Sequence, residues 1–284
     1  MQPKTSFRLK LIFNMFNFNG TIVSKINDVE PELVHALKNS FSIFETVRYQ
    51  NDKILFWDFH YLRMMASLRR FRFNIPKYFS FEFLETEIIK LIKINRKTTN
   101  DFLFEFHFFS DARITYFLIS LLPSKPLKIN DSKYLIDLYK ENSIRASDIS
   151  NFSITNRGLR RIAAKYADEN ELNDVVLINE HKNIVETSLG TIYLIQNNKI
   201  LTPSLDSGCQ DFAIRSYFNS WLKKEETSFQ LFEIILSPFE IQKSDEFFVL
   251  SIESGIQVVK NYRKTNFKRE KSKFLCEKFI ESNI

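Results

Sequence analysis

Cysteine is scarce in this chain, and long apolar runs are missing. The only cysteines, Cys209 and Cys276, have no CxxC partner, and no histidine cluster completes a set of metal ligands. This composition favours a protein of the reducing cytoplasm without a bound metal, and it leaves one disulfide open. No stretch approaches the roughly 18 apolar residues that span a bilayer, so we expect no membrane partner.

Positive charge exceeds negative charge, and much of the excess lies in one stretch. The formal net charge is +6, and residues 260–273 read KNYRKTNFKREKSK. Such a segment can bind a polyanion, but neither an aromatic stacking platform nor a nucleic-acid motif accompanies it. We therefore interpret it as a solvent-exposed final strand and helix, and we do not expect a nucleic-acid partner.

Hydrophobic residues make up 44% of the chain, which is enough for a substantial core. Alternating apolar residues and turn signals predict hairpins at residues 16–23, 41–58, 101–122, 173–186 and 190–203. Apolar residues at helical spacing predict helices near residues 61–71, 81–92 and 159–166. Few crossover units separate these hairpins, so the sequence predicts an α+β fold.

Three local details refine this prediction. In the second hairpin Glu45 interrupts an otherwise apolar row of odd-numbered strand positions. The third helix is marked by apolar residues at helical spacing, which predicts that they share a buried face: Leu159, Ile162, Ala163 and Tyr166. Ser237 and Glu240 have the spacing of a capping box at the start of a short helix.

Composition also suggests how the chain divides into parts. Residues 1–14 precede Met15, which reads like a natural start, so they are interpreted as an extension. Residues 15–122 would form a small N-terminal α/β domain. Residues 123–131, PSKPLKIND, have two prolines and little apolar content and would be a linker. Residues 132–284 would form a larger C-terminal domain.

Several blocks follow one another in a recognisable order. They are FETVR at 44–48, HYLRM at 60–64, ITNR at 154–157, DVVLINEHKNIVET at 174–187, IYLIQNNKILTPSLDSGC at 192–209 and AIR at 213–215. The ordered series resembles the class IV aminotransferases, the fold-type IV pyridoxal-phosphate proteins. This family includes branched-chain and D-amino-acid aminotransferases and aminodeoxychorismate lyase.

The resemblance implies a small N-terminal α/β domain, a larger C-terminal domain around a barrel-like sheet, and a homodimer. Pyridoxal phosphate would lie between the domains, where it needs a lysine, an acid at its pyridine nitrogen, donors for its phosphate, and room for a substrate. If the cofactor is kept, the resemblance implies that Arg63, Glu186, Asn156, Ala213 and Ile214 bind it. Arg63 matches the phosphate arginine and Glu186 the pyridine-nitrogen acid. The plain alternatives are a surface arginine and an exposed hairpin glutamate.

The chain departs from the family at the lysine. The family places it three residues before the asparagine that matches Asn156, and here that position is Ser153. A hydroxyl forms no imine with the cofactor aldehyde and cannot serve as the amine base. No lysine lies between Lys140 and Lys165, although a distant lysine as substitute is left open.

The expected phosphate turn is altered as well. The family's glycine, isoleucine and threonine before the arginine correspond to Phe212, Ala213 and Ile214, and a glycine-rich turn before FET has become SFS at 40–42. A bulky side chain at Phe212 would obstruct the backbone amides that bind a phosphate.

These departures favour a protein that has kept the scaffold and has lost or repurposed the chemistry. It would bind a small molecule or a partner protein, with pyridoxal phosphate not covalently bound or absent. The alternative is an active aminotransferase or aminodeoxychorismate lyase-like enzyme. A heterodimer with a related, active subunit is a further alternative to the homodimer.

Overall fold

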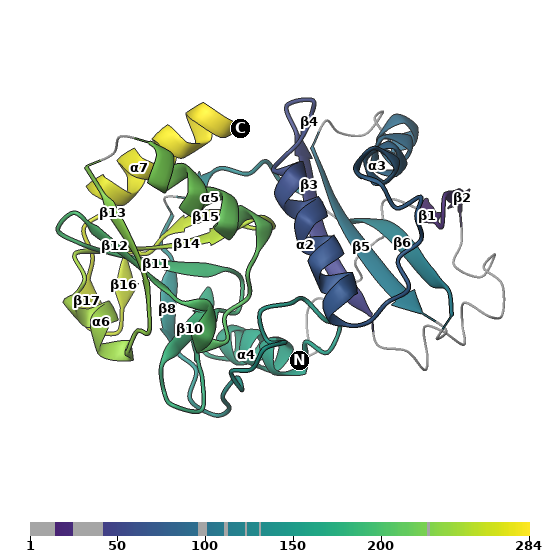
Figure 1. The fold of residues 1–284 in the computed structure, drawn as a ribbon. Coiled ribbons are helices and arrows are strands. Elements are labelled where there is room, and N and C mark those ends of the chain that lie inside the picture. Colours follow the sequence, from purple (N-terminus) through teal and green to yellow (C-terminus); the bar gives the residue numbers. More distant parts are fainter. Residues whose placement is uncertain are drawn as a thin grey trace, which may run out of the picture.

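The computed structural model describes residues 15–24, 42–95, 101–110, 113–122, 124–130, 132–225 and 228–284. The predicted extension at 1–14 lies outside these residues, as do Ser40 and Phe41. The chain forms two parts that lie side by side in Figure 1, each with helices and sheets. The predicted α+β class is confirmed. No helix among the described residues has the length and apolar character needed to cross a membrane.

The N-terminal part is a six-stranded antiparallel sheet in the order β2-β1-β6-β5-β3-β4. Its strands are β1 (Phe16–Phe18), β2 (Thr21–Val23), β3 (Ile43–Gln50), β4 (Lys53–Ile54), β5 (Phe102–Ser110) and β6 (Thr115–Leu122). Its helices are α2 (Trp57–Arg70) and α3 (Phe81–Asn95). The three hairpins predicted here are present, and Ser80 Oγ accepts a hydrogen bond from the amide of Phe83, 3.1 Å away, at the start of α3.

Both helices pack on the same face of this sheet. Met64 and Leu68 of α2 and Leu84 of α3 are fully buried against strand residues such as Phe104. On the other face of the sheet, Thr46 and Arg48 of β3 form hydrogen bonds with Glu253 and Ile252 of the C-terminal part. Helix α2 lies on the side of the sheet nearest that part (Figure 1) and contacts α5 (Ala213–Lys224). The cleft between the two parts is therefore bordered by β3 and α2.

The C-terminal part contains two sheets. The first has the order β10-β9-β8-β16-β17 and the second β13-β12-β11-β14-β15-β7. The strands are β7 (Ile129–Asn130), β8 (Leu135–Leu138), β9 (Asp174–Ile178), β10 (Ile184–Thr187), β11 (Thr191–Gln196), β12 (Lys199–Pro203), β13 (Gln230–Ile234), β14 (Glu246–Ser251), β15 (Gly255–Val258), β16 (Asn261–Tyr262) and β17 (Thr265–Asn266). The helices are α4 (Gly158–Glu169), α5 (Ala213–Lys224), α6 (Pro238–Lys243) and α7 (Glu270–Asn283), with a 3-10 turn η2 (Leu205–Ser207).

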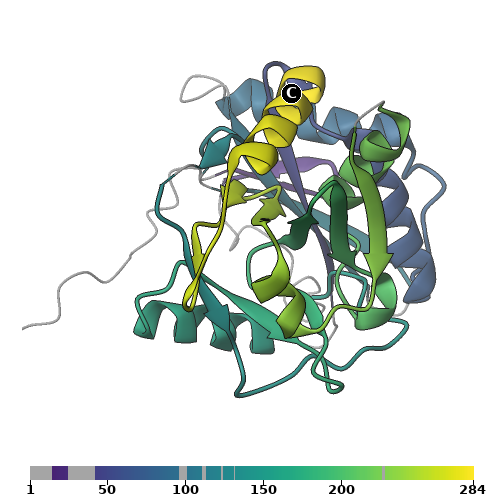
Figure 2. The ribbon, with the colours of Figure 1, turned by 90° about the vertical axis from the view of Figure 1, so that its left-hand side faces the viewer.

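The two sheets share one apolar core. Ile136, Val176 and Ile184 of the first sheet pack with Leu194 and Phe247 of the second. Their hydrogen-bonded ladders do not join into a closed barrel within the described residues. Figure 2 looks onto this part, with α7 (yellow) along one end and α4 (teal) at the other.

Two local predictions were wrong. Ile162 of α4 is 54% exposed, and the buried residues of this helix are Ala163 and Ala167. A helix held against its sheet by alanines approaches closely and leaves a neighbouring isoleucine outside. At α6 no side chain caps the helix start, because Glu240 binds Gln196 and Lys243 instead of reaching back to Ser237.

The segment that connects the two parts, residues 124–130, is bonded to both of them. Ile129 and Asn130 form β7, which pairs in parallel with β15 of the C-terminal sheet. The buried side chain of Arg48 on β3 donates to the carbonyl oxygens of Ile252, Glu253 and Lys125 at 2.6–2.8 Å. These bonds connect the N-terminal sheet to the turn between β14 and β15.

Candidate functional site

Arg63 lies on α2, one turn beyond His60, and both side chains are buried beside Glu45 of β3. The Nδ1 of His60 is 2.6 Å from Glu45 Oε1, and Arg63 forms an ion pair with the other carboxylate oxygen. Burial alone would raise the pKa of Glu45, but the guanidinium and the imidazole outweigh it and hold that pKa below its ordinary value. The predicted phosphate arginine therefore already has an internal anion.

Ser153 faces the same cleft and is 1% exposed. Its backbone lies against the start of β3, where its carbonyl oxygen accepts a hydrogen bond from Phe44 N at 3.0 Å. Its Oγ accepts from Arg63 Nη2 at 2.7 Å and donates to Gln210 Oε1 at 3.0 Å. The side chain at the lysine position thus joins α2 to the loop before α5.

Glu186 lies on β10 and is 1% exposed, so the alternative of an exposed hairpin glutamate is wrong. Its Oε1 accepts from Arg160 Nε at 2.6 Å, and its Oε2 accepts from the backbone amide of Gln210 at 2.8 Å. Both carboxylate oxygens are thus occupied by groups of the protein itself.

Of the remaining predicted residues, Ala213 and Ile214 lie at the site and Asn156 lies apart from it. Ala213 and Ile214 begin α5 and are buried beside Arg63. Phe212 precedes them, and its ring centre lies 5.8 Å from the Arg63 guanidinium carbon. Asn156 is exposed before α4 and lines neither of the hollows that border Ser153 and Glu186.

Very little space remains where a phosphate would have to lie. The cavity bordered by Arg63, Ser153, Phe212, Ala213 and Ile214 measures about 20 Å³, room for about one water molecule. Pyridoxal phosphate needs a free amine, a free acid and a phosphate pocket in this region. The residues present do not fit that group. Among the described residues no lysine borders this cavity, the acid is bonded on both oxygens, and little space remains in the pocket.

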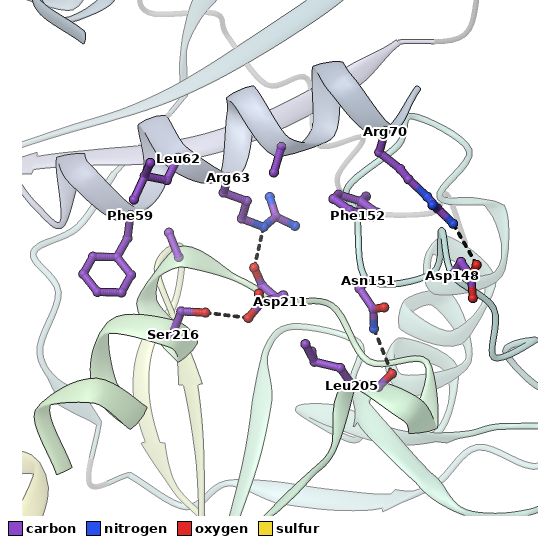
Figure 3. A pocket seen from close by; sticks show the side chains of 12 residues that line it. Phe59, Leu62, Arg63, Arg70, Asp148, Asn151, Phe152, Leu205, Asp211 and Ser216 are labelled. Atoms are coloured by element: carbon purple, nitrogen blue, oxygen red, sulfur yellow. Dashed lines mark hydrogen bonds and ion pairs between the residues drawn. The ribbon is translucent and has the colours of Figure 1, made fainter. Parts of the chain in front are cut away.

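Two larger hollows flank this filled centre. A groove of about 610 Å³ lies between α2 and the loops of the C-terminal part (Figure 3). Figure 3 shows Arg63 reaching to the backbone of Asp211, whose carboxylate accepts from Ser216. The second hollow, about 200 Å³, lies beside Glu186 at the start of α4.

The chain belongs to the class IV aminotransferase family, whose model matches residues 42–262. It is 25% identical over 233 residues to a probable branched-chain-amino-acid aminotransferase of Thermotoga maritima, covering 81% of this chain and 80% of the relative. Members of this family bind pyridoxal phosphate, as the Thermobaculum terrenum structure described next illustrates.

Two solved structures show the same fold. One is the branched-chain amino acid aminotransferase of Thermobaculum terrenum in its PLP form, with a TM-score of 0.79, 17% identity, and coverage of 95% of this chain and 93% of that one. The other is a putative 4-amino-4-deoxychorismate lyase of Legionella pneumophila, with a TM-score of 0.74, 18% identity, and coverage of 87% and 93%.

Sequence reasoning missed the partners that fill the site. Glu45, Gln210 and Arg160 were not among the predicted site residues, yet they bind Arg63, Ser153 and Glu186. One signal was present, because Glu45 interrupts the apolar row of a central strand, and a carboxylate buried there needs a cation. No comparable signal marks Gln210.

Proposed function

We propose that this class IV aminotransferase-like protein has lost or repurposed catalysis through a pyridoxal-phosphate Schiff base. It acts as a scaffold that binds a small molecule or a partner protein. Family membership accounts for the fold. The contacts among the side chains of the cleft are what support the proposed loss of Schiff-base catalysis. A chain without the lysine can still bind a ligand between its two parts.

The observation that carries this proposal is the continuous set of contacts from Glu45 through Arg63 and Ser153 to Gln210. The two charged groups that would serve the cofactor, Arg63 and Glu186, are each bonded to other groups of the chain. Buried polar groups that are fully bonded fix one arrangement, and replacing those bonds with a ligand would require breaking them first. Deleting a principal catalytic group can also lower a rate on the order of a millionfold.

The proposal is tested by incubating the purified protein with pyridoxal phosphate and reducing with borohydride. We expect no stoichiometric attachment of the cofactor to any lysine by mass spectrometry, and no turnover across a panel of amino acids. A lysine-containing class IV aminotransferase treated in parallel provides the positive control. Stoichiometric trapping on one lysine, together with amino transfer, would instead identify an active enzyme.

We also propose that the chain pairs, either with a second copy of itself or with a related subunit. The family resemblance motivates this. Light scattering of the purified chain is expected to give the mass of two copies. If it gives the mass of one copy, and a tagged chain purified from its native cell carries no related subunit, the pairing proposal is wrong.

A further inference from the structure

Three arginines gather at the start of α4 and line the hollow of about 200 Å³ beside Glu186. All three lie within the five residues 157–161 and border this pocket: Arg157, Arg160 and Arg161. No acidic residue lies in the first turn of α4. Positive side chains at this end of a helix face the positive end of its dipole, so helix stability does not explain the arrangement.

Two of the three guanidiniums are held by carboxylates of the chain. Arg157 pairs with Glu105, and its guanidinium carbon lies 3.2 Å from the ring centre of Phe44. Arg160 pairs with Glu186. These contacts fix two positive groups at the pocket wall before any ligand arrives, which reduces the ordering that binding would require.

Arg161 differs from its neighbours. No carboxylate within the described ranges lies at ion-pairing distance from its guanidinium, and no hydrogen bond to it is formed there. The other carboxylate that lines the pocket, Glu253, accepts a hydrogen bond from Thr46 at 3.0 Å and acts electrostatically on Arg48. Arg161 is exposed, and it also borders a neighbouring hollow that Glu141 and Glu169 line. Its guanidinium is therefore available to a ligand at the edge of the pocket.

The rest of the lining is apolar or aromatic on one side. Phe212 and Leu189 border the pocket, and Leu189 is 43% exposed at its edge. The volume equals that of roughly seven liquid waters. A space of this size suits a small flat molecule such as a single aromatic ring with one carboxylate.

We propose that this pocket binds a small monocarboxylic acid. Its carboxylate pairs with Arg161, assisted by the N–H groups that Arg160 does not direct at Glu186, and its apolar body packs against Phe212 and Leu189. Arginine suits this task because its planar fork can donate two parallel bonds to a carboxylate. The inference rests on the proposed function, since it takes the cleft to be free of pyridoxal phosphate.

Calorimetric titration of the full chain with benzoate tests the inference, and benzamide is the neutral ligand of the same shape. We expect benzoate to bind and benzamide to bind at least about tenfold more weakly. Arg161→Gln should weaken benzoate binding by about tenfold or more, and Arg161→Lys should restore part of it. Lys165→Gln is the matched control, because Lys165 lies one turn further on α4 with its side chain 68% exposed, and it should change nothing.

Equal binding of benzoate and benzamide would show that no charge is recognised, and so would an unchanged affinity in Arg161→Gln. If Arg161→Gln and Lys165→Gln weakened benzoate binding equally, the effect would come from the net charge of α4 and not from a specific contact with Arg161. Each of these results overturns the inference while leaving the proposed function intact. Covalent trapping of pyridoxal phosphate on a lysine would overturn the proposed function. If benzoate then competed with that cofactor, the inference would be overturned as well, because it takes the cleft to be free of pyridoxal phosphate.

Discussion

A single hydroxyl at position 153 changes what the neighbouring side chains can do. Ser153 is small and uncharged, and it both accepts from Arg63 and donates to Gln210. A lysine at this position would place a second cation beside the guanidinium of Arg63. The serine therefore suits the arrangement of Arg63 with Glu45, and we expect a lysine at this position to disturb that arrangement.

We expect Ser153→Lys to lower the free energy of unfolding by about 3 kcal/mol, because it buries an unpaired ammonium beside Arg63. It should not restore covalent binding of pyridoxal phosphate, since the cavity beside Phe212 stays small. Urea unfolding and borohydride trapping measure the two effects. Ser153→Ala, which removes two hydrogen bonds without adding charge, should lose only about 1–2 kcal/mol. Stoichiometric trapping in a stable lysine variant would contradict this account, whereas trapping only after Phe212→Gly is added would support it.

Glu45 is the anion that balances Arg63, so its removal should be severe. Glu45→Gln leaves a buried guanidinium without its charged partner, and we expect the free energy of unfolding to fall by about 3–5 kcal/mol. Chemical denaturation measures the change. Asp148→Asn is the control, because Asp148 forms an exposed pair with Arg70 and surface pairs contribute little. Similar losses in both variants would mean that the buried pair has no special role.

At the scale of helices and strands, periodicity predicted a large part of the fold. Hairpins and helices follow from patterns of neighbouring residues, and those elements are present with shifted ends. Ile162 was misplaced because its exposure depends on how closely the alanines of α4 approach the sheet. The contacts of Ser153 depend on residues from 63 to 210 along the chain. Such pairings are set by tertiary packing, and no local pattern specifies them.

Arg48 connects a strand of one part to a turn of the other. Its guanidinium donates to three carbonyl oxygens and to Ser124 Oγ. We expect Arg48→Met to lower the free energy of unfolding by about 3 kcal/mol, because the buried carbonyls lose their donors. Hydrogen exchange should rise at the amides of residues 124–130 before it rises elsewhere. Arg263→Met, which removes a partly exposed pair with Asp137, should do neither.

For the molecule as a whole, buried carboxylates with shifted pKa values connect stability to pH. Burial would raise the pKa of Glu105, but His107 and Arg157 outweigh it and lower that pKa to about 2. The pKa of Glu45 is lowered too, whereas burial raises that of Asp174 above its ordinary value. A carboxylate whose pKa is lowered by folding stabilises the fold at pH values above its unfolded pKa. This contribution is lost as the pH falls through its folded pKa. Asp174 has a raised pKa, so its contribution to stability decreases as the pH rises.

Comparing the wild type with Glu105→Gln isolates one of these groups, because Glu45 and Asp174 titrate in both proteins. At neutral pH the wild type should be more stable by roughly 3 kcal/mol, the contribution expected from the lowered pKa. This difference should shrink as pH falls from 4.5 toward about 2, where the glutamate becomes protonated and resembles glutamine. Urea unfolding at a series of pH values gives the difference directly. A constant difference over that range would mean that Glu105 stabilises the fold by packing, and that its ion pair with Arg157 contributes no net charge interaction.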